Sequence, residues 1–275
     1  MILILGQGFV AHEFERFYGE NAKLSEHRVE DYSALLHHLK EERPEVVINC
    51  IGKTGRPNVD WCEDHPHETL FSNVTVPLMI ARACAELGIY WVHVGSGCVY
   101  SGDNDGRGFA EHDAPNFSGS FYSRTKAWSE SMLKEFPVLQ LRLRMPLMGR
   151  PDERNFITKI ARYPKVISVP NSISVFPDFL EAAAQLIERR RTGIYNMTNP
   201  GAIDHREILS MYTELVDPSF HPVYMSLEEL AGVTKAARSN CVLSTQKLAD
   251  EGIVMRPVKE AVRSALLEYA HHVRV

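Results

Sequence analysis

The 275-residue sequence lacks the features that mark several classes of protein. It has no surplus of positive charge, since the formal net charge is −5, and so it carries no electrostatic footprint for nucleic acid or an anionic membrane. The apolar run Met1–Leu5 is too short for a signal peptide, and no apolar stretch approaches the roughly 20 residues that cross a bilayer. We therefore expect neither nucleic-acid nor membrane partners.

Cysteine is also scarce. Five cysteines, an odd number, stand at positions 50, 62, 84, 98 and 241 without a CxxC pair, which argues against a disulfide framework and a zinc site. The segment from Cys62 to His67 contains possible metal ligands, but Pro66 followed by a helical pattern favours a loop and a helix start. We predict a reduced, cytoplasmic protein with no bound metal.

Apolar residues are plentiful, at 44%, and they alternate between short runs typical of strands and longer amphipathic runs typical of helices. This alternation predicts βαβ units and hence an α/β fold with a Rossmann-type doubly wound parallel sheet. Ligands are expected at the carboxyl ends of the strands, at Gly6, in the 52–60 loop and in the 95–98 loop. The expected strands are 2–5, 22–24, 46–50, 90–94, 138–143 and 193–197, and the expected helices are 9–18, 34–42, 67–87, 121–135, 179–190, 204–216 and 258–273.

The pattern changes beyond Met145, where proline recurs at positions 146, 151, 164, 170 and 177 and the strand patterns become short. We therefore predict a dinucleotide-binding domain over residues 1–145 and 171–198. A smaller C-terminal substrate lobe is expected over residues 146–170 and 199–275.

A glycine-rich turn follows the first expected strand. Its sequence, GQGFVA from Gly6 to Ala11, is G-x-G-x-x-A at the start of a helix. The first glycine permits a tight turn, the second lets the backbone approach a pyrophosphate, and the helix N-terminus faces the negative charge. We predict that Gly6, Gly8, Phe9 and Val10 bind NAD(P).

The end of the second expected strand bears on the choice of cofactor. Glu26, about 20 residues past Gly6, would hold the ribose 2′-hydroxyl of NADH, whereas Arg28 would meet the 2′-phosphate of NADPH. We expect NADPH, and NADH stays open. Asp31 either lies near the adenine or simply caps the next helix.

Gly52 is expected beside the cofactor, at the end of the third strand. The segment Gly52-Lys53-Thr54 is not a P-loop, because Val47 stands where that motif requires glycine.

Tyr122 and Lys126 are four residues apart at a helix start, so both project from one face. A phenol, with a pKa of about 10, is a poor acid at neutral pH, and a neighbouring ammonium favours its ionised form. Ser96, after the fourth strand, is placed to hydrogen-bond the same carbonyl oxygen. The three residues predict a short-chain dehydrogenase in which Tyr122 donates a proton, Lys126 activates it and Ser96 polarises a ketone.

Several longer runs narrow this prediction: GRPNVDWCE (55–63), PNFSGSFYS (115–123), RLRMP (142–146), RNFITKI (154–160), TNPG (198–201) and AARSN (236–240). Together they resemble the bifunctional 3,5-epimerase/4-reductase family of UDP-rhamnose synthesis, which is close to the dTDP-4-dehydrorhamnose reductases. The resemblance covers the chain from about residue 44 to the C-terminal helices. It implies conversion of UDP-4-keto-6-deoxy-D-glucose to UDP-L-rhamnose with NAD(P)H.

The resemblance also implies an epimerase, for which the family uses a cysteine and a lysine that match Cys98 and Lys159. Protons at C3 and C5 of a 4-keto sugar are acidic because the ketone delocalises the carbanion. Inversion requires one group to remove a proton and another to supply one to the opposite face. A thiol and an amine suit this chemistry if their pKa values are tuned towards neutrality.

Polar residues of the matching runs are candidates for binding the sugar or the diphosphate. An arginine offers a planar pair of donors to phosphate oxygens, and we rank Arg238 first because its run matches the family in the C-terminal lobe. The sequence departs from the family in a shorter glycine loop, in Lys53 and Ser96 (usually threonine in plant members), and in a shorter 99–112 loop. The candidates are Arg56, Asn58, Asp60, Asn116, Ser120, Arg144, Asn155 and Arg238.

Two alternatives stay open. One is a dTDP- or UDP-4-dehydrorhamnose reductase without epimerase activity. The other is a non-catalytic dehydrogenase-like regulatory subunit, which the presence of both Tyr122 and Lys126 disfavours. The sequence does not decide between UDP and dTDP, or whether the chain forms a homodimer.

Overall fold

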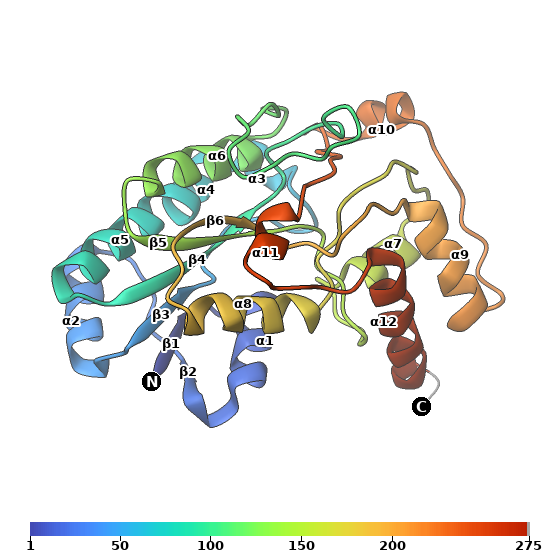
Figure 1. Ribbon diagram of the computed structural model, residues 1–275. Helices are drawn as coiled ribbons and strands as arrows, with labels where there is room; N and C mark the ends of the chain where they lie inside the picture. Colours follow the sequence, from blue (N-terminus) through green and yellow to red (C-terminus); the bar gives the residue numbers. More distant parts are fainter. Residues whose placement is uncertain (274–275) are drawn as a thin grey trace. The chain divides into compact units, whose positions relative to one another are not determined.

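Strands and helices alternate through the first half of the chain in the computed structural model, which describes residues 1–273 (Figure 1). The strands are β1 (Ile2–Leu5), β2 (Ala22–Leu24), β3 (Val46–Asn49), β4 (Tyr90–Ser96), β5 (Val138–Leu143) and β6 (Gly193–Asn196). The helices are α1 (Phe9–Tyr18), α2 (Tyr32–Glu42), α3 (Trp61–Asp64), α4 (Pro66–Leu70), α5 (Val76–Leu87), α6 (Phe121–Leu133), α7 (Phe156–Arg162), α8 (Asp178–Glu188), α9 (His205–Leu215), α10 (Leu227–Val233), α11 (Gln246–Asp250) and α12 (Val258–Val273).

The six strands form one sheet in the order β2-β1-β3-β4-β5-β6. β1 pairs in parallel with β2 and with β3, and β3 pairs in parallel with β4, so that Leu5, Asn49 and His93 lie in register across three strands. The carboxyl ends of these strands therefore share one edge, where parallel α/β sheets bind ligands. The predicted Rossmann-type fold is confirmed.

Two compact units divide the chain, and each has its own core. Unit 1 consists of residues 1–99, 117–142 and 184–195, and unit 2 consists of residues 100–116, 143–183 and those from 196 onward. In unit 1, α2, α5 and α6 contact one another in succession, while α1 packs on β1 and β2 (Figure 1). The apolar residues between the sheet and the α2–α5 layer include Leu3, Leu35, Val47, Ile80 and Trp91.

The division into units differs from the predicted domains at several segments. Residues 100–116, 143–145, 171–183 and 196–198 belong to unit 2, whereas we expected them in the dinucleotide-binding domain. The assignment of cofactor and substrate to particular domains stays a prediction.

One long helix was predicted over residues 67–87, and the structure confirms it. α4, a π-helical segment (Phe71–Thr75) and α5 run together as a 22-residue helix from Pro66 to Leu87, which is long and apolar enough to cross a membrane by length and composition alone. The statement that no apolar stretch approaches this length was therefore wrong. Val76, Ile80 and Cys84 of this helix lie in the core of unit 1, as in the core helix of a globular domain.

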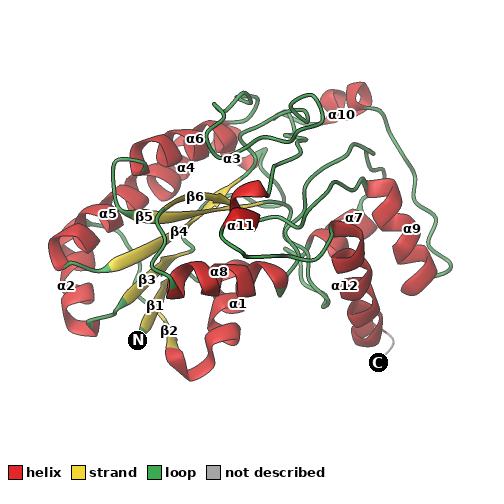
Figure 2. Cartoon of the chain, in the orientation of Figure 1, coloured by secondary structure: helices red, strands yellow, loops and turns green. Residues whose placement is uncertain are grey.

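Within the described residues, unit 2 contains helices α7 and α9 to α12 together with isolated bridges between single residues, and its long loops are visible in Figure 2. Its core gathers apolar side chains of α7, α9 and α12, among them Ile157, Ile208 and Leu266. α7, α10 and α11, and α3 of unit 1, were not predicted, because helices of four to seven residues are too short to show a clear period.

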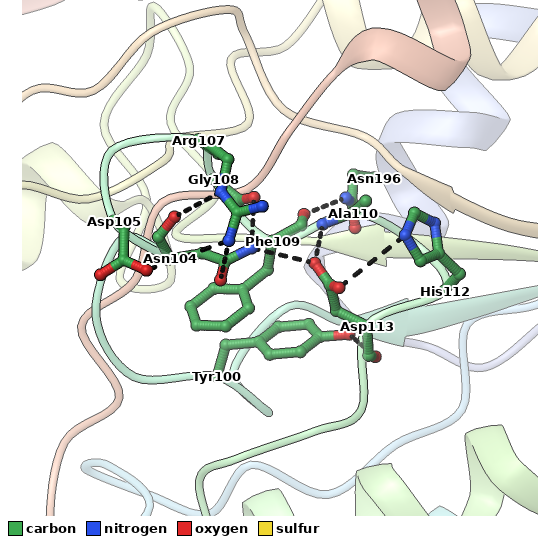
Figure 3. Close-up of polar contacts among 10 residues, drawn as sticks. All are labelled: Tyr100, Asn104, Asp105, Arg107, Gly108, Phe109, Ala110, His112, Asp113 and Asn196. Carbon is green, nitrogen blue, oxygen red and sulfur yellow. Dashed lines mark hydrogen bonds and ion pairs between the residues drawn. The ribbon is translucent and has the colours of Figure 1, made fainter.

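The loop over residues 100–116 is held by its own contacts within unit 2 (Figure 3). The rings of Tyr100 and Phe109 stack with centroids 4.5 Å apart, and the Tyr100 hydroxyl donates to the carbonyl oxygen of Asp113 at 2.7 Å. The Asp113 carboxylate accepts from the backbone N–H of Ala110 at 2.8 Å, and Asn196 donates from Nδ2 to the carbonyl oxygen of Phe109 at 2.9 Å. The loop therefore has a defined conformation.

Candidate active site

The glycine turn after β1 has a backbone that only glycine fits well. Gly6 has φ +108°, and a Cβ there would lie 3.1 Å from the carbonyl carbon of Cys50. Gly8 is the N-cap residue of α1, and among the described residues no side chain caps that helix end. An uncapped helix N-terminus after a tight glycine turn fits a pyrophosphate.

The end of β2 lies beside this turn, because Gln7 donates from Nε2 to the carbonyl oxygen of Ser25 at 2.5 Å. Glu26 and Arg28 are both exposed just beyond it. Asp31 is the N-cap of α2 and accepts from the backbone N–H of Ala34 at 2.9 Å. The capping role considered for Asp31 is confirmed, and its contact with a cofactor stays a prediction.

α6 carries the predicted reductase pair, and a serine fixes where it begins. Ser120 is the N-cap: its Oγ accepts from the Ser123 backbone N–H at 3.1 Å and donates to Ser123 Oγ at 2.8 Å. The side chain is buried, at 2% exposed. The structure thus gives Ser120 a role in starting the helix, and its predicted contact with the sugar stays a prediction.

Tyr122 and Lys126 follow on one face of α6, and both are buried, at 8% and 6% exposed. Lys126 donates from Nζ to the carbonyl oxygen of Val94 on β4 at 3.5 Å. A Cβ on Gly52 would lie 3.2 Å from Lys126 Nζ. The absence of a side chain at Gly52 therefore gives the ammonium its space at the end of the sheet.

Burial lowers the pKa of Lys126 to about 8, because the ammonium loses water, while neighbouring Cys50 and Cys98 act in the opposite direction. The same burial, with some opposition from Lys126, raises the pKa of the Cys50 thiol. Lys126 is thus an ammonium that titrates close to neutrality beside two sulfur atoms.

Ser96 and Cys98 end β4 and begin the turn after it. Ser96 is 5% exposed, and its Oγ accepts from the backbone N–H of Cys98 at 3.1 Å. Cys98 is half-buried. The structure therefore brings Ser96, Cys98 and Lys126 together at the end of one strand.

Asn73 joins the 52–53 loop to α6, and sequence reasoning did not find it. Asn73 Oδ1 accepts from the backbone N–H of Lys53 at 2.7 Å, and Nδ2 donates to the Lys53 carbonyl at 3.1 Å and to Thr125 Oγ1 at 3.1 Å. The residue lies in the π-helical segment, a local distortion frequent at functional sites. In the sequence it appears only as part of Asn-x-Thr, which gives no hint of this contact.

The 55–60 loop is a compact turn in unit 1. Asn58 Oδ1 accepts from the Asp60 backbone N–H at 2.8 Å. Gly55 has φ +72°, and a Cβ added at this position would lie only 2.5 Å from Cβ of Trp61. Asn58 therefore shapes the loop, while Arg56 is exposed on it. Substrate contacts of Arg56, Asn58 and Asp60 stay predictions.

Two of the predicted substrate residues in unit 2 are engaged inside the protein. Arg144 is 1% exposed and donates from Nη2 to Asn171 Oδ1 and to the Ser239 carbonyl. Asn155 is fully buried, caps α7, and donates from Nδ2 to the carbonyl oxygens of Met148 and Arg150 at 2.9 and 2.7 Å. Both residues hold the fold of unit 2, and their contact with substrate stays a prediction.

The remaining candidates of unit 2 have different surroundings. Asn116 accepts from the backbone N–H of Ser101 at 2.8 Å and donates from Nδ2 to the Ser101 carbonyl oxygen at 3.0 Å. Arg238 donates from Nη1 to the Ala236 carbonyl oxygen at 2.6 Å. Lys159 is half-buried on α7. Burial and the neighbouring Arg154 lower its pKa, and Asp152 partly opposes them. The pKa of Lys159 is therefore shifted towards neutrality, the direction that favours acid–base chemistry.

Comparison with known proteins agrees with this geometry. The family model of the RmlD substrate binding domain matches residues 2–271. The chain is 43% identical over 248 residues to an Arabidopsis thaliana protein described as bifunctional dTDP-4-dehydrorhamnose 3,5-epimerase/dTDP-4-dehydrorhamnose reductase, with 88% of this chain and 82% of that protein covered.

A longer relative and a solved structure are also similar to this chain over most of its length. A trifunctional UDP-glucose 4,6-dehydratase/UDP-4-keto-6-deoxy-D-glucose 3,5-epimerase/UDP-4-keto-L-rhamnose-reductase of Arabidopsis thaliana is 43% identical over 251 residues, and the match spans 89% of this chain but only 37% of that protein. The crystal structure of the L780 UDP-rhamnose synthase from Acanthamoeba polyphaga mimivirus matches with a TM-score of 0.93 and 31% identity, over 98% of this chain and 99% of that one. The chain therefore belongs to the RmlD substrate-binding-domain family, among its bifunctional 3,5-epimerase/reductase members, as the sequence resemblance indicated.

Proposed function

We propose that the chain epimerises C3 and C5 of UDP-4-keto-6-deoxy-D-glucose and then reduces the ketone at C4, which gives UDP-L-rhamnose. The observation that supports this best is the gathering of Lys126, Ser96 and Cys98 at the end of β4, beside the helix that carries Tyr122. These are the residues proposed for the reduction, with one of the two proposed for the epimerisation, in a chain 43% identical to a protein named for both activities.

In the reduction, NADPH supplies the hydride that C4 accepts. Tyr122 gives its phenolic proton to the ketone oxygen, and Ser96 donates a hydrogen bond to the same oxygen. The ammonium of Lys126 stabilises the phenolate that remains on Tyr122, because opposite charges at close range favour the ionised form. Burial of both side chains strengthens this effect, since water screens it less.

In the epimerisation, Cys98 and Lys159 are the proton-transfer groups. At each carbon, one of them takes the proton and converts the C4 ketone into its enolate, and the other returns a proton to the same carbon from the opposite face, which restores the ketone. The lowered pKa of Lys159 increases the fraction of neutral amine near pH 7, which is the form that accepts a proton.

The cofactor and the nucleotide have separate candidate contacts. Gly6, Gly8, Phe9 and Val10 would hold the pyrophosphate of the dinucleotide, and exposed Arg28 would meet the 2′-phosphate of NADPH. For the sugar nucleotide we propose UDP, since the names of the longer plant relative and the viral enzyme both specify UDP. Arg238 is the first candidate for its diphosphate.

The decisive test is turnover of UDP- and dTDP-4-keto-6-deoxy-glucose with NADPH, with products separated by stereochemistry. Without cofactor, deuterium from solvent should enter C3 and C5. Tyr122→Phe should lose reduction by a factor of about 10² to 10⁴ and keep this exchange. Tyr18→Phe is the matched control, because within residues 1–273 the Tyr18 hydroxyl is buried without a hydrogen-bond partner. Reduction without any exchange would leave a simple reductase.

We further propose a cytoplasmic homodimer. The five cysteines are thiols, as expected in a reducing compartment. Leu70, Phe71, Trp128 and Met132 expose 37% to 46% of their surface on α4, the π-helical segment and α6, which contact one another. Such an apolar patch suits a subunit interface, and light scattering of wild type and Trp128→Glu would test it.

A further inference from the structure

Ser96 links the two proposed activities through one hydroxyl. A serine hydroxyl offers one O–H donor and two acceptor lone pairs. In the structure Ser96 Oγ accepts from the Cys98 backbone N–H at 3.1 Å, which leaves its O–H available for a ketone oxygen. The bond to Cys98 and the bond to the substrate therefore do not compete for the same proton.

The bond to Cys98 acts on the backbone where the thiol leaves the sheet. Ser96 is the last residue of β4 and is buried, while Cys98, two residues on, lies in the following turn and is half-buried. Short side chains that bond a backbone N–H two residues ahead define such turns. Loss of the Ser96 hydroxyl would leave the turn, and the thiol on it, with fewer constraints.

Lys126 acts on the same thiol through its charge. The ammonium is held by the Val94 carbonyl, and Cys98 and Cys50 are the groups that act electrostatically on it. The nearest acid on the same helix face, Glu130, is already paired with Arg142 at 2.7 and 2.8 Å. The charge of Lys126 and the turn that carries Cys98 therefore meet at the end of β4.

We infer that Ser96 and Lys126 are positioning residues for Cys98 in the epimerisation, in addition to their part in the reduction, whereas Tyr122 serves the reduction alone. This inference rests on the proposed function. Its consequence is an asymmetry: loss of Ser96 or Lys126 impairs both reactions, and loss of Tyr122 impairs one.

The test is the rate of solvent deuterium exchange at C3 and C5 of UDP-4-keto-6-deoxy-glucose without cofactor. Ser96→Ala should slow exchange roughly tenfold, the effect of one lost hydrogen bond. Ser96→Thr keeps the hydroxyl and should restore exchange to within about twofold of wild type. Ser129→Ala is the matched control, because within the described chain Ser129 is a buried serine of unit 1 whose hydroxyl lacks a partner.

A second measurement does not depend on substrate. Alkylation of Cys98 by iodoacetamide, followed by mass spectrometry, reports the accessibility and reactivity of the thiol. Lys126→Met should change the rate of alkylation severalfold, while Lys134→Met, at the exposed end of α6, should not. Equal alkylation in both lysine variants, or wild-type exchange in Ser96→Ala, would overturn the inference. Absence of exchange in the wild type would instead remove the proposed epimerase, and the alkylation result would still decide whether Lys126 acts on Cys98.

Discussion

The Nζ atom of Lys126 lies 3.5 Å from the carbonyl oxygen of Val94, two residues before Ser96 on the same strand. This contact joins α6 to the end of β4 through a charged group. The arrangement has an electrostatic cost, because the ammonium is buried, and the cost appears as the fall of its pKa to about 8. The reduction that we propose would therefore depend on a lysine that is close to losing its charge.

The rate of reduction should fall as the pH rises through about 8. Lys126 is protonated below this pH and neutral above it, and only the ammonium stabilises the Tyr122 phenolate. We expect the rate of NADPH oxidation at saturating substrate to fall up to tenfold per pH unit above about 8. Initial rates measured between about pH 6 and 10 would define this falling limb of the pH–rate profile.

Lys126→Arg is the matched variant for this prediction. A guanidinium keeps its charge throughout this range, so the falling limb should move above about pH 10, whatever the loss in absolute rate. A limb that stays in place in Lys126→Arg would assign the titration to another group.

The charges of Arg154 and Asp152 should shift the pH dependence of the epimerisation in opposite directions, because both act on the pKa of Lys159. Arg154 contributes to the lowered pKa of Lys159, and Asp152 opposes it. Exchange requires the neutral amine at one step and so rises with pH through this pKa. Arg154→Gln should move the rising limb to higher pH, and Asp152→Asn should move it to lower pH.

The pH dependence of deuterium exchange in the two variants measures these displacements. Lys159→Met should abolish the exchange that depends on the amine while keeping the reduction of a substrate that is already epimerised. Displacement of the limb in the same direction by both substitutions would show that Lys159 is not the titrating group.

Removal of Arg28 should decide the cofactor preference that the sequence left open. If Arg28 meets the 2′-phosphate, Arg28→Ala should weaken NADPH binding about ten- to a hundredfold, since hydrogen bonds between charged groups contribute about 1.5–3 kcal/mol, and leave NADH binding unchanged. Glu26→Ala should have little effect on NADPH. Fluorescence titration of each variant with both reduced cofactors gives the four dissociation constants. Loss of NADH binding in Glu26→Ala, with NADPH binding unaffected by Arg28→Ala, would reverse the assignment.

The sequence predicted unit 1 better than unit 2 for a physical reason. Helices such as Phe9–Tyr18 are long enough to show their period, and strands such as Val46–Asn49 are apolar runs because the sheet buries every residue of them. In unit 2 the chain is held by single bridges and by buried polar groups such as Arg144 and Asn155, which carry no periodic pattern. Their residue types suggested ligands, and the structure shows them bonded to backbone carbonyls.

Only part of the candidate site could likewise be predicted from the sequence. Spacing alone placed Tyr122 and Lys126 on one helix face, because the period of an α-helix is fixed. The contacts of Asn73 with Lys53 and Thr125 join residues 20 and 52 positions away, and no local pattern encodes such a distance. The bond from Cys98 to Ser96 is local, but serine and cysteine two residues apart are too common to predict it.

The buried ion pair between α6 and β5 should contribute far more to stability than exposed pairs do. Glu130, one turn beyond Lys126, receives two hydrogen bonds from Arg142 on β5, at 2.7 and 2.8 Å, and the two side chains are 8% and 0% exposed. Removal of one partner leaves the other charge buried without its counter-ion, which typically costs about 3–5 kcal/mol. We expect Glu130→Ala to lower the free energy of unfolding by this amount.

The exposed pair Arg263–Glu214 is the matched control, because it has similar two-bond geometry, at 2.7 and 3.2 Å, but side chains 47% and 58% exposed. Water screens such a pair, so Glu214→Ala should cost far less stability than Glu130→Ala does. Urea unfolding followed by circular dichroism compares the two variants directly. Equal losses would show that the Glu130–Arg142 charges stay solvated, and α6 would then be held by its apolar contacts and by Lys126 rather than by this pair.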